Sequence, residues 1–237
     1  MDLHDSNKDF MTFRSGITNL YLLPHEGEYI LVDAGMKKKE KAFLSFLTKQ
    51  KIHPEEIRYI FLTHTHYDHT GALKLLHELT HATILLHASE AGYLRKGYTP
   101  APRGTRISTK VISFLGRKVF PGYSRYEPAE PDILWEESGY RPAPFPAELL
   151  HTPGHTEGSA SLVWKEEAAF VGDTLFGYEK EDSLPWFAND MALLKQSWQR
   201  LLDTSCDIFY PSHGRPVKRA LLEESFRKHF GEPAGEA

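Results

Sequence analysis

The sequence predicts one globular domain of the α+β class, in which a strand-rich first half and a strand-rich second half each carry helices. The chain has 237 residues, of which 41% are hydrophobic, so it is long enough to bury a large core and short enough to form one domain, 1–237. Short apolar runs typical of β-strands alternate with segments whose apolar residues recur at helical spacing. Several of the strand-like runs end in histidine or aspartate.

The first half begins with a predicted β-hairpin. Residues 17–23 (ITNLYLL) and 29–33 (YILVD) have strand-like composition, and the polar link HEGE between them favours a tight turn. The segment KKKEKAFLSFLTKQK at 37–51 has its apolar residues at helical spacing and predicts a helix. The elements expected next are a buried strand at 59–63, a helix at 70–79, a strand at 82–88 and a helix at 89–96.

The second half follows an irregular insertion. Residues 97–146 are rich in proline, arginine and aromatic residues, and we expect either a substrate lid or a surface insertion there. Within it, ISTKVISFLGRKVF predicts a short helix whose apolar residues pack over the domain edge. Strands are then expected at 149–152, 159–164, 168–173 and 207–214, and helices at 190–202 and 217–230.

Composition and charge exclude several classes of partner. The formal net charge is -4 with acids and bases interspersed, so there is no basic stripe for nucleic acid and no polybasic anchor for a membrane surface. No apolar run approaches the roughly 20 residues that span a bilayer, and the N-terminal MDLHDSNKDF lacks the features of a signal peptide. The lone Cys206 is expected to be a buried apolar residue. We therefore expect a cytoplasmic protein that acts on a small molecule, with its oligomeric state left open.

The stretch FLTHTHYDHTG at 61–71 places His64, His66, Asp68 and His69 directly after an apolar run. In an extended segment His64 and His66 point to the same side, and the following turn can bring the other two toward a neighbouring position. A catalytic zinc takes three protein ligands, whereas a two-metal site needs about twice as many, usually with a bridging carboxylate. Further ligands are therefore expected downstream.

Three further candidates follow later in the chain. His155 in HTPGHT, Asp173 in FVGDTLF and His213 in YPSHG each stand at or just past the end of an apolar strand-like run. Together with the first cluster they give five histidines and two aspartates, a mixed nitrogen and oxygen set suited to zinc, manganese or iron rather than calcium. Of the remaining histidines, His151 is the one most expected to contact these ligands from outside.

With these seven residues in order, the sequence resembles the metallo-β-lactamase superfamily, whose signature H-x-H-x-D-H is followed by separate His, Asp and His motifs. The resemblance covers about residues 17 to 216 and implies an αββα four-layer sandwich of two mixed β-sheets, with the metal site at one edge of the sheets. It also implies two divalent metal ions, one held by His64, His66 and His155 and the other by Asp68, His69 and His213, with Asp173 bridging them.

These ligands imply hydrolysis. A bound metal lowers the pKa of water from about 15.7 to about 7, so hydroxide is available at neutral pH without a separate base. We expect a metal-bridging hydroxide to attack a carbonyl carbon, while Asp68 orients it and helps to pass its proton on. The sequence thus predicts a dinuclear hydrolase of a small ester, thioester or lactone, with zinc expected and manganese or iron as alternatives. A non-catalytic metal-binding or partner-binding member of the fold is the alternative of another class, and the complete ligand set argues against it.

Differences from known branches of the superfamily narrow the substrate. Asp173 stands where zinc β-lactamases of this layout carry cysteine or serine, and His66 where flavodiiron-type oxidoreductases carry glutamate. GDTLF at 172–176 resembles glyoxalase II-like thioesterases, whereas the quorum-quenching lactonases have tyrosine at the place of Phe176. The chain departs from those thioesterases in lacking the glycine- and arginine-rich segment that follows this motif and the long C-terminal extension that binds glutathione, so a glutathione thioester is not the expected substrate. Acyl-homoserine lactonase and β-lactamase-like activities remain alternatives, and the candidate substrate-binding residues are Phe176, Trp186 and Phe187.

A rival motif lies close by, because HELTH at 77–81 matches the zincin pattern H-E-x-x-H, and His87 falls where a metzincin has its third ligand. That arrangement needs a glycine turn, but Ile84 occupies the position within the strand-forming run ATILLHA. We interpret the motif as a chance match on a helix whose apolar face is expected to consist of Leu73, Leu76 and Leu79.

Overall fold

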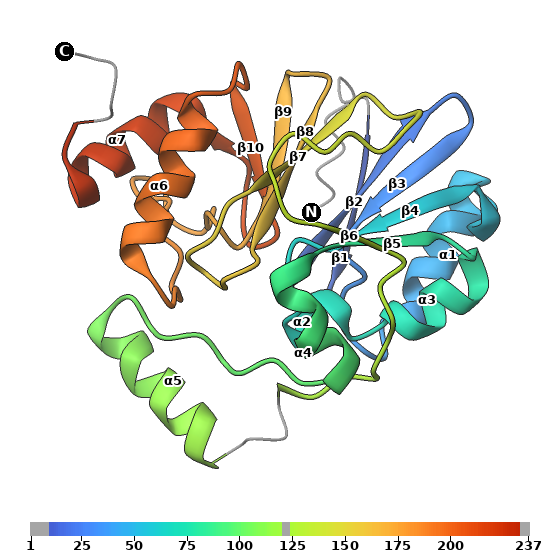
Figure 1. Cartoon of the computed structure of the whole chain (residues 1–237), viewed down its shortest axis with the longest axis horizontal. Coiled ribbons are helices and arrows are strands. Elements are labelled where there is room, and N and C mark those ends of the chain that lie inside the picture. The colour runs from blue at the N-terminus through green and yellow to red at the C-terminus, as the bar shows by residue number, and fades with distance from the viewer. Residues whose placement is uncertain (1–9, 120–123, 233–237) are drawn as a thin grey trace.

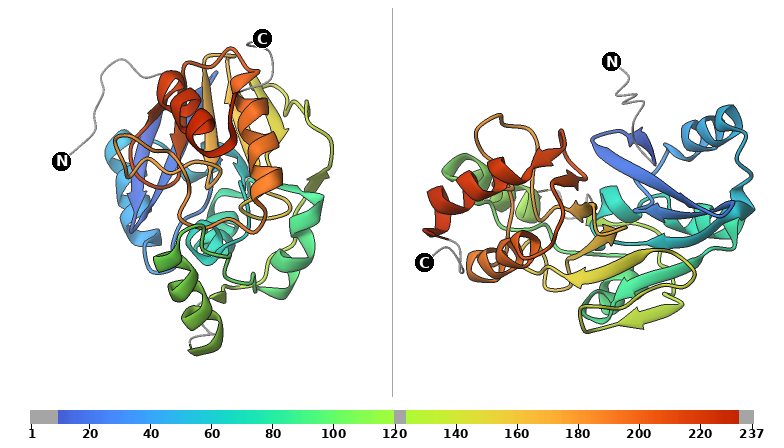
Figure 2. Two further views of the ribbon diagram at one scale, coloured as in Figure 1. Left: turned by 90° about the vertical axis from the view of Figure 1, so that its left-hand side faces the viewer. Right: turned by 90° about the horizontal axis from the view of Figure 1, so that it is seen from above.

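The computed structural model describes residues 10–119 and 124–232. Two β-sheets lie face to face, and helices cover the outer face of each sheet (Figure 1). Figure 2 shows the same layers from the side and from above, with the N-terminal sheet and its helices on one flank and the C-terminal sheet and its helices on the other. The predicted αββα sandwich is therefore confirmed.

The first sheet has the strand order β1-β2-β3-β4-β5-β6. Its hairpin of β2 and β3 is antiparallel, with Tyr21 opposite Val32, and the turn at Glu26 and Gly27 has positive φ at both residues, as tight hairpins require. From β3 to β6 the pairs are parallel. The strand bounds are β1 Met11–Ser15, β2 Thr18–His25, β3 Glu28–Val32, β4 Ile57–Phe61, β5 Thr83–His87 and β6 Ile133–Trp135.

The second sheet has the order β11-β10-β9-β8-β7. Strands β9 and β10 are parallel, and the other pairs are antiparallel. The strand bounds are β7 Ala147–His151, β8 Ala160–Trp164, β9 Ala168–Gly172, β10 Ile208–Pro211 and β11 Val217–Lys218. The helices are α1 Glu40–Gln50, α2 Tyr67–Thr70, α3 Leu73–Thr80, α4 Ala91–Lys96, α5 Ile107–Val119, α6 Met191–Leu202 and α7 Arg219–Phe230, with 3-10 turns at Pro54–Glu56 and Ala88–Glu90.

Three apolar cores separate the four layers, and strand β2 contributes to two of them because its side chains alternate between its faces. Leu20 and Leu22 pack toward α1 and α3, while Tyr21 and Leu23 pack between the sheets. The third core lies between the second sheet and helices α6 and α7, and it contains Trp198 and the buried Cys206. Burial on both faces is why the strands read as continuous apolar runs.

The insertion at 97–146 contains the predicted helix, α5, which projects from the body of the molecule (Figure 1). Its expected packing is wrong, since Ile107 is 85% and Val111 55% exposed. The side of α5 that faces the body carries Thr109 and Ser113 instead, and the hydroxyl of Ser113 donates to the carbonyl of Pro102. The end of the insertion supplies β6, an edge strand that the sequence pattern did not reveal.

No helix in the part of the chain that the structure describes has both the length and the apolar character needed to cross a membrane.

Candidate metal centre

The seven predicted ligands follow strand ends from both sheets. The segment from His64 to His69 follows β4, Asp173 comes directly after β9, and His213 follows β10. Because neighbouring parallel strands end at the same edge of a sheet, β3 with β4 and β9 with β10 bring their carboxyl ends together. The loop that begins after β7 adds His155 at the same place.

A glycine at the end of β9 allows the two sheets to approach at this edge. Gly172 has φ +54, and a Cβ there would lie 2.7 Å from the side chain of Thr63, directly before His64. The carbonyl of Thr63 accepts a 2.8 Å hydrogen bond from the amide of Ala160 in β8. The loop that carries the histidines is thus held against the second sheet.

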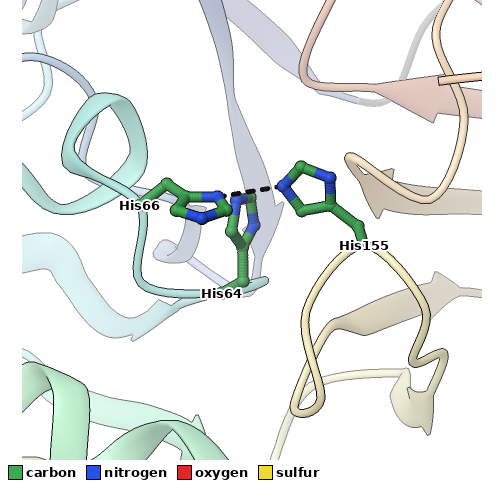
Figure 3. A group of neighbouring side chains, drawn as sticks. All are labelled: His64, His66 and His155. Atoms are coloured by element: carbon green, nitrogen blue, oxygen red, sulfur yellow. Dashed lines mark hydrogen bonds between the residues drawn. The ribbon is translucent and has the colours of Figure 1, made fainter. Parts of the chain in front are cut away.

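Within the described residues, the ligand atoms form three overlapping groups, each with its atoms within 4.8 Å of one another. In the first group the ring of His66 faces that of His155, with His66 Nδ1 and His155 Nε2 2.9 Å apart, beside His64 (Figure 3). The groups are His64, His66 and His155; His64, His69 and Asp173; and Asp68, His69 and His213.

The carboxylate of Asp173 lies between the two histidine clusters. Its Oδ2 is 3.4 Å from His155 Nε2, whereas its Oδ1 is 3.4 Å from His69 Nε2 and 3.3 Å from His213 Nε2. Asp68 belongs to the second cluster, with its Oδ2 3.3 Å from His213 Nε2, and the hydroxyl of Thr18 donates to the same oxygen at 3.1 Å. Each carboxylate therefore has a fixed orientation.

Each of the five histidines has one ring nitrogen paired outside the cluster and the other directed inward. A backbone carbonyl or carboxylate can only accept, so the paired nitrogen carries a proton and the inward nitrogen is the one whose lone pair a metal ion could use. The outer partners are Thr63 Oγ1 for His64, Pro100 O for His66, Asp33 Oδ2 for His69, Phe187 O for His155 and Ile17 O for His213.

Asp33 is the residue of this centre that the sequence reasoning missed. It is fully buried after β3, and its carboxylate accepts from Thr63 N at 2.9 Å, His69 Nδ1 at 2.7 Å and Ser212 Oγ at 3.1 Å. The hydroxyl of Thr63 also donates to Asp33, which leaves its oxygen free to accept from His64 Nδ1. The signal was present in YILVD, an apolar strand that ends in aspartate at the same edge as the ligands.

The expectation for His151 differs from what the structure shows. His151 stacks on His87 with ring centroids 3.9 Å apart, and its Nε2 pairs with the carbonyl of Glu157. The outer partners of the ligands come from other residues, so sequence proximity to His155 was a poor guide.

The donor set fits a metal ion. His64 Nε2, His69 Nε2 and Asp173 Oδ1 are buried without a hydrogen-bond partner, an arrangement that costs free energy unless something fills the space between them. Two atoms bound to one tetrahedral zinc at about 2.0–2.1 Å lie about 3.3–3.4 Å apart, close to the separations of Asp173 from its neighbours.

The pKa values of the histidines also differ between the first group and His69 of the second. Burial and the neighbouring histidines hold the pKa of His64 well below its usual value, and burial lowers that of His155 to about 4. Burial would also lower the pKa of His69, but Asp33, Asp68 and Asp173 outweigh it and raise the value to about 10. The first group is therefore neutral at pH 7, whereas His69 in the second carries an extra proton, stabilised by the carboxylates, that a bound metal ion would displace.

The three predicted substrate residues lie on two sides of the cluster. Phe176 is buried with its ring 4.9 Å from that of His213, and Trp186 is partly exposed nearby. Phe187, the next residue, reaches the side of the first group, where its carbonyl accepts from His155 Nδ1. On that side a cleft of about 400 Å³ opens beside the first group, lined in part by Tyr93, Pro100, Arg103, Thr156 and Asn189.

The zincin motif forms no such centre. His77 lies on α3 with Nδ1 2.9 Å from the carbonyl of Ala82, and His81 is the exposed, left-handed residue that ends the helix. Among the described residues neither belongs to a group able to hold a metal, and His87 pairs with the carbonyl of Glu136. The predicted apolar face of α3 was partly wrong, because Leu79 is 36% exposed and Thr80 is buried in its place.

Comparisons with known proteins agree with this geometry. A family model described as the metallo-beta-lactamase superfamily matches residues 14–213. A probable metallo-hydrolase of Methanocaldococcus jannaschii is 28% identical over 90% of this chain and 94% of its own length. An atrochrysone carboxyl ACP thioesterase of Aspergillus fumigatus is 27% identical over 85% of this chain, which spans 52% of that protein. The crystal structure of the BLEG-1 B3 metallo-beta-lactamase has 25% identity and a TM-score of 0.69, covering 93% of this chain and 97% of its own.

Proposed function

The chain belongs to the metallo-β-lactamase superfamily and is a metal-dependent hydrolase, and from this premise we propose that it cleaves a small ester, thioester or lactone with two divalent metal ions. One ion would be held by His64, His66 and His155 and the other by Asp68, His69 and His213, with Asp173 shared between them. Zinc suits the nitrogen-rich donor set, and manganese or iron is compatible with it.

The position of Asp173 is the observation that carries this proposal. Its two oxygens face different histidine clusters, Oδ2 toward His155 and Oδ1 toward His69 and His213. A carboxylate that serves a single ion would direct its oxygens to one cluster only. This arrangement supports two adjacent ions rather than one.

When bound, such ions supply an activated water at neutral pH and polarise the carbonyl of the substrate. The chain's own contribution is the placement of Asp68. Its carboxylate is buried, is held by the hydroxyl of Thr18, and has its pKa lowered because His69 and His213 outweigh the effect of burial. It is therefore ionised and in position to orient the attacking water and to accept its proton.

A small-molecule substrate fits the space beside the cluster. The cleft measures about 400 Å³, within the range of small-ligand pockets, and it is lined by Pro100, whose carbonyl pairs with His66, and by Gly154 and Thr156 on either side of His155. Its lining is mixed: Arg103, Thr156 and Asn189 offer hydrogen-bonding groups, and Tyr93, Pro100 and Leu193 add apolar surface, which suits a small organic group. The thioesterase among the relatives is consistent with this class of substrate.

A β-lactamase-like activity is the second candidate, favoured by the likeness to a B3 metallo-beta-lactamase. We rank it lower because the bridging position holds Asp173, which offers an oxygen to each cluster. A non-catalytic member of the fold is disfavoured because all seven ligands are present and brought together.

Metal content and hydrolysis measured on the same samples test the proposal. The substrates are S-lactoylglutathione, an acyl-homoserine lactone, a β-lactam and an aryl ester, each assayed with wild type, Asp68→Ala and Asp207→Ala. Asp207→Ala is the matched control because its exposed carboxylate precedes β10 at the end away from His213. We expect about two ions per wild-type chain and turnover that Asp68→Ala alone abolishes. A protein that binds no transition metal after expression in metal-replete medium would refute the ligand assignment.

A further inference from the structure

Two partly exposed aromatic side chains border the metal centre on the side of His213. The ring of Tyr178 lies nearly parallel to that of His213, with centroids 6.3 Å apart and planes inclined by 25°. The ring of Trp186 lies 4.8 Å from that of Tyr178, and Trp186 and Tyr178 are 36% and 40% exposed, respectively. Phe176 is buried in contact range of all three rings. We call Tyr178 and Trp186 the aromatic wall.

The aromatic wall is fixed in place although it lies outside any helix or strand. The indole N–H of Trp186 donates to Glu179 Oε1 at 3.4 Å, and Glu179 is paired with Arg106. The carbonyl of Trp186 accepts from Thr105 N at 3.0 Å. The polar edge of the Trp186 ring is thus anchored, while part of its apolar surface meets solvent. Because the side chain is already held in place, a ligand that covers it costs the protein little conformational entropy.

The two sides of the metal centre differ in chemistry. Beside His213 the exposed apolar groups include the aromatic wall and Ile17, which is 44% exposed and whose carbonyl accepts from His213 Nδ1 at 3.0 Å. Beside His66 and His155 lies the cleft, whose lining adds the hydrogen-bonding side chains of Arg103, Thr156 and Asn189 to its apolar surface. A carbonyl carbon placed between the clusters would therefore have exposed aromatic rings on one side and a cleft with hydrogen-bonding groups on the other.

We propose that the aromatic wall is the acyl subsite, so that the enzyme prefers substrates with an apolar acyl group, which lies on Tyr178 and Trp186 while the polar leaving group occupies the cleft. This inference rests on the proposed function. The wall carries no unpaired charge, since Glu179 is neutralised by Arg106. Short or charged acyl groups would gain little binding free energy from the aromatic wall. Each methylene added to an apolar chain would gain some, because one side of it is removed from water.

The kinetic test uses esters or thioesters with one leaving group and acyl chains from acetyl to octanoyl. A fully buried methylene favours binding about fourfold, so one that is covered on one side should contribute about twofold. Over six methylenes, kcat/KM of the metal-replete wild type should rise roughly 60-fold. Trp186→Ala should reduce this octanoyl-to-acetyl ratio to about tenfold or less, and Trp186→Phe, which keeps an aromatic ring, should retain most of it.

Leu134→Ala is the matched control. Leu134 is 42% exposed on the edge strand β6, so its truncation removes a similar exposed apolar side chain away from the metal centre. The octanoyl-to-acetyl ratio of this variant should equal that of the wild type. Circular dichroism and a thermal melt confirm that each variant is folded.

A binding measurement separates the aromatic wall from the reaction. Trp186 is the exposed tryptophan of the chain, whereas Trp135, Trp164 and Trp198 are at most 4% exposed, so acrylamide quenching of tryptophan fluorescence reports mainly on Trp186. Octanoate, but not acetate, should protect it from acrylamide in the metal-replete protein. The quenchable signal should be missing in Trp186→Phe.

The outcomes distinguish the two proposals. Turnover without any dependence on acyl length, or a ratio unchanged in both Trp186→Ala and Tyr178→Ala, would overturn the acyl subsite and leave the hydrolase intact. If no ester or thioester is cleaved, the proposed reaction is refuted, and the acrylamide quenching of Trp186 alone tests whether the aromatic wall binds apolar groups. Protection by octanoate then supports an apolar binding site, and equal quenching with octanoate and acetate overturns it.

Discussion

Replacing Asp33 by asparagine should weaken metal binding by reversing the tautomer of His69. The Oδ1 of Asp33 accepts from the backbone amide of Thr63 at 2.9 Å, and the Oδ2 accepts from His69 Nδ1 at 2.7 Å. A backbone amide can only donate, so in Asp33→Asn the side-chain oxygen must stay at the Oδ1 position and the NH2 group must face His69. His69 Nδ1 then becomes the acceptor, and the ring proton moves to Nε2, the nitrogen directed at the carboxylates.

The expected size of this effect is a 10- to 100-fold loss of affinity for the second metal ion, which is typical for the loss of an outer partner and corresponds to about 1.4–2.8 kcal/mol. The hydroxyls of Thr63 and Ser212 can turn to accept from the new amide, so the fold should persist. Zinc affinity is measured by competition with a chromophoric chelator, beside circular dichroism.

Asp132→Asn is the matched control. Its carboxylate accepts a 2.8 Å hydrogen bond from Ile84 N in the first sheet, a role that an amide oxygen can keep, and it lies outside the three metal-binding groups. Zinc binding should be unchanged in this variant. If Asp33→Asn bound two zinc ions as tightly as Asp132→Asn does, the outer partner would not set the tautomer and the reasoning would be refuted.

Three further predictions concern the bridging residue, the sheet contact and the stacked pair of His87 and His151. Asp173→Asn should lower the zinc content from about two ions per chain to one or fewer, as measured by plasma mass spectrometry; an unchanged content would contradict its shared position. Gly172→Ala should lower the melting temperature, because its φ of +54 and the 2.7 Å approach of a Cβ to Thr63 both oppose a side chain, and the strain should cost about 1–3 kcal/mol; an unchanged melt would show that the loop moves freely. Burial, together with His151, lowers the pKa of His87, so the unfolded chain binds more protons and stability should fall as the pH drops below about 6.5. Urea unfolding of the metal-replete protein should show this loss to be smaller in His87→Gln, and identical pH profiles would exclude the contribution.

The sequence predicted those parts of the fold that produce a periodic pattern of apolar residues along the chain. The hairpin of β2 and β3, the helices and the buried strands appear as periodic apolar patterns, and the ligands stand at strand ends where the chain must turn. Strand β6 was missed because ILW is a short edge strand whose partner β5 is distant in the sequence. Strand β1 could have been found, because MTFRS begins with alternating apolar and polar residues and pairs with the adjacent β2.

The outer partners of the ligands were less predictable for the same reason. Ile17 O and Pro100 O hold His213 and His66 through backbone atoms, which any residue could supply and which no sequence motif marks. Asp33 could have been found, because an aspartate that ends a buried strand at the edge of the ligands needs donors. The exposure of the apolar residues of α5 could not have been predicted, because helical spacing reveals an apolar stripe but not whether it faces the protein or the solvent.

The most direct test of the account is the anomalous scattering of zinc in crystals of the zinc-reconstituted protein. We predict two peaks about 3.5–4 Å apart, one beside His64, His66 and His155 and the other beside Asp68, His69 and His213, with Asp173 between them. A single peak would contradict the dinuclear centre. No peak at these residues, or one beside His77 and His81, would contradict the assignment of the site itself.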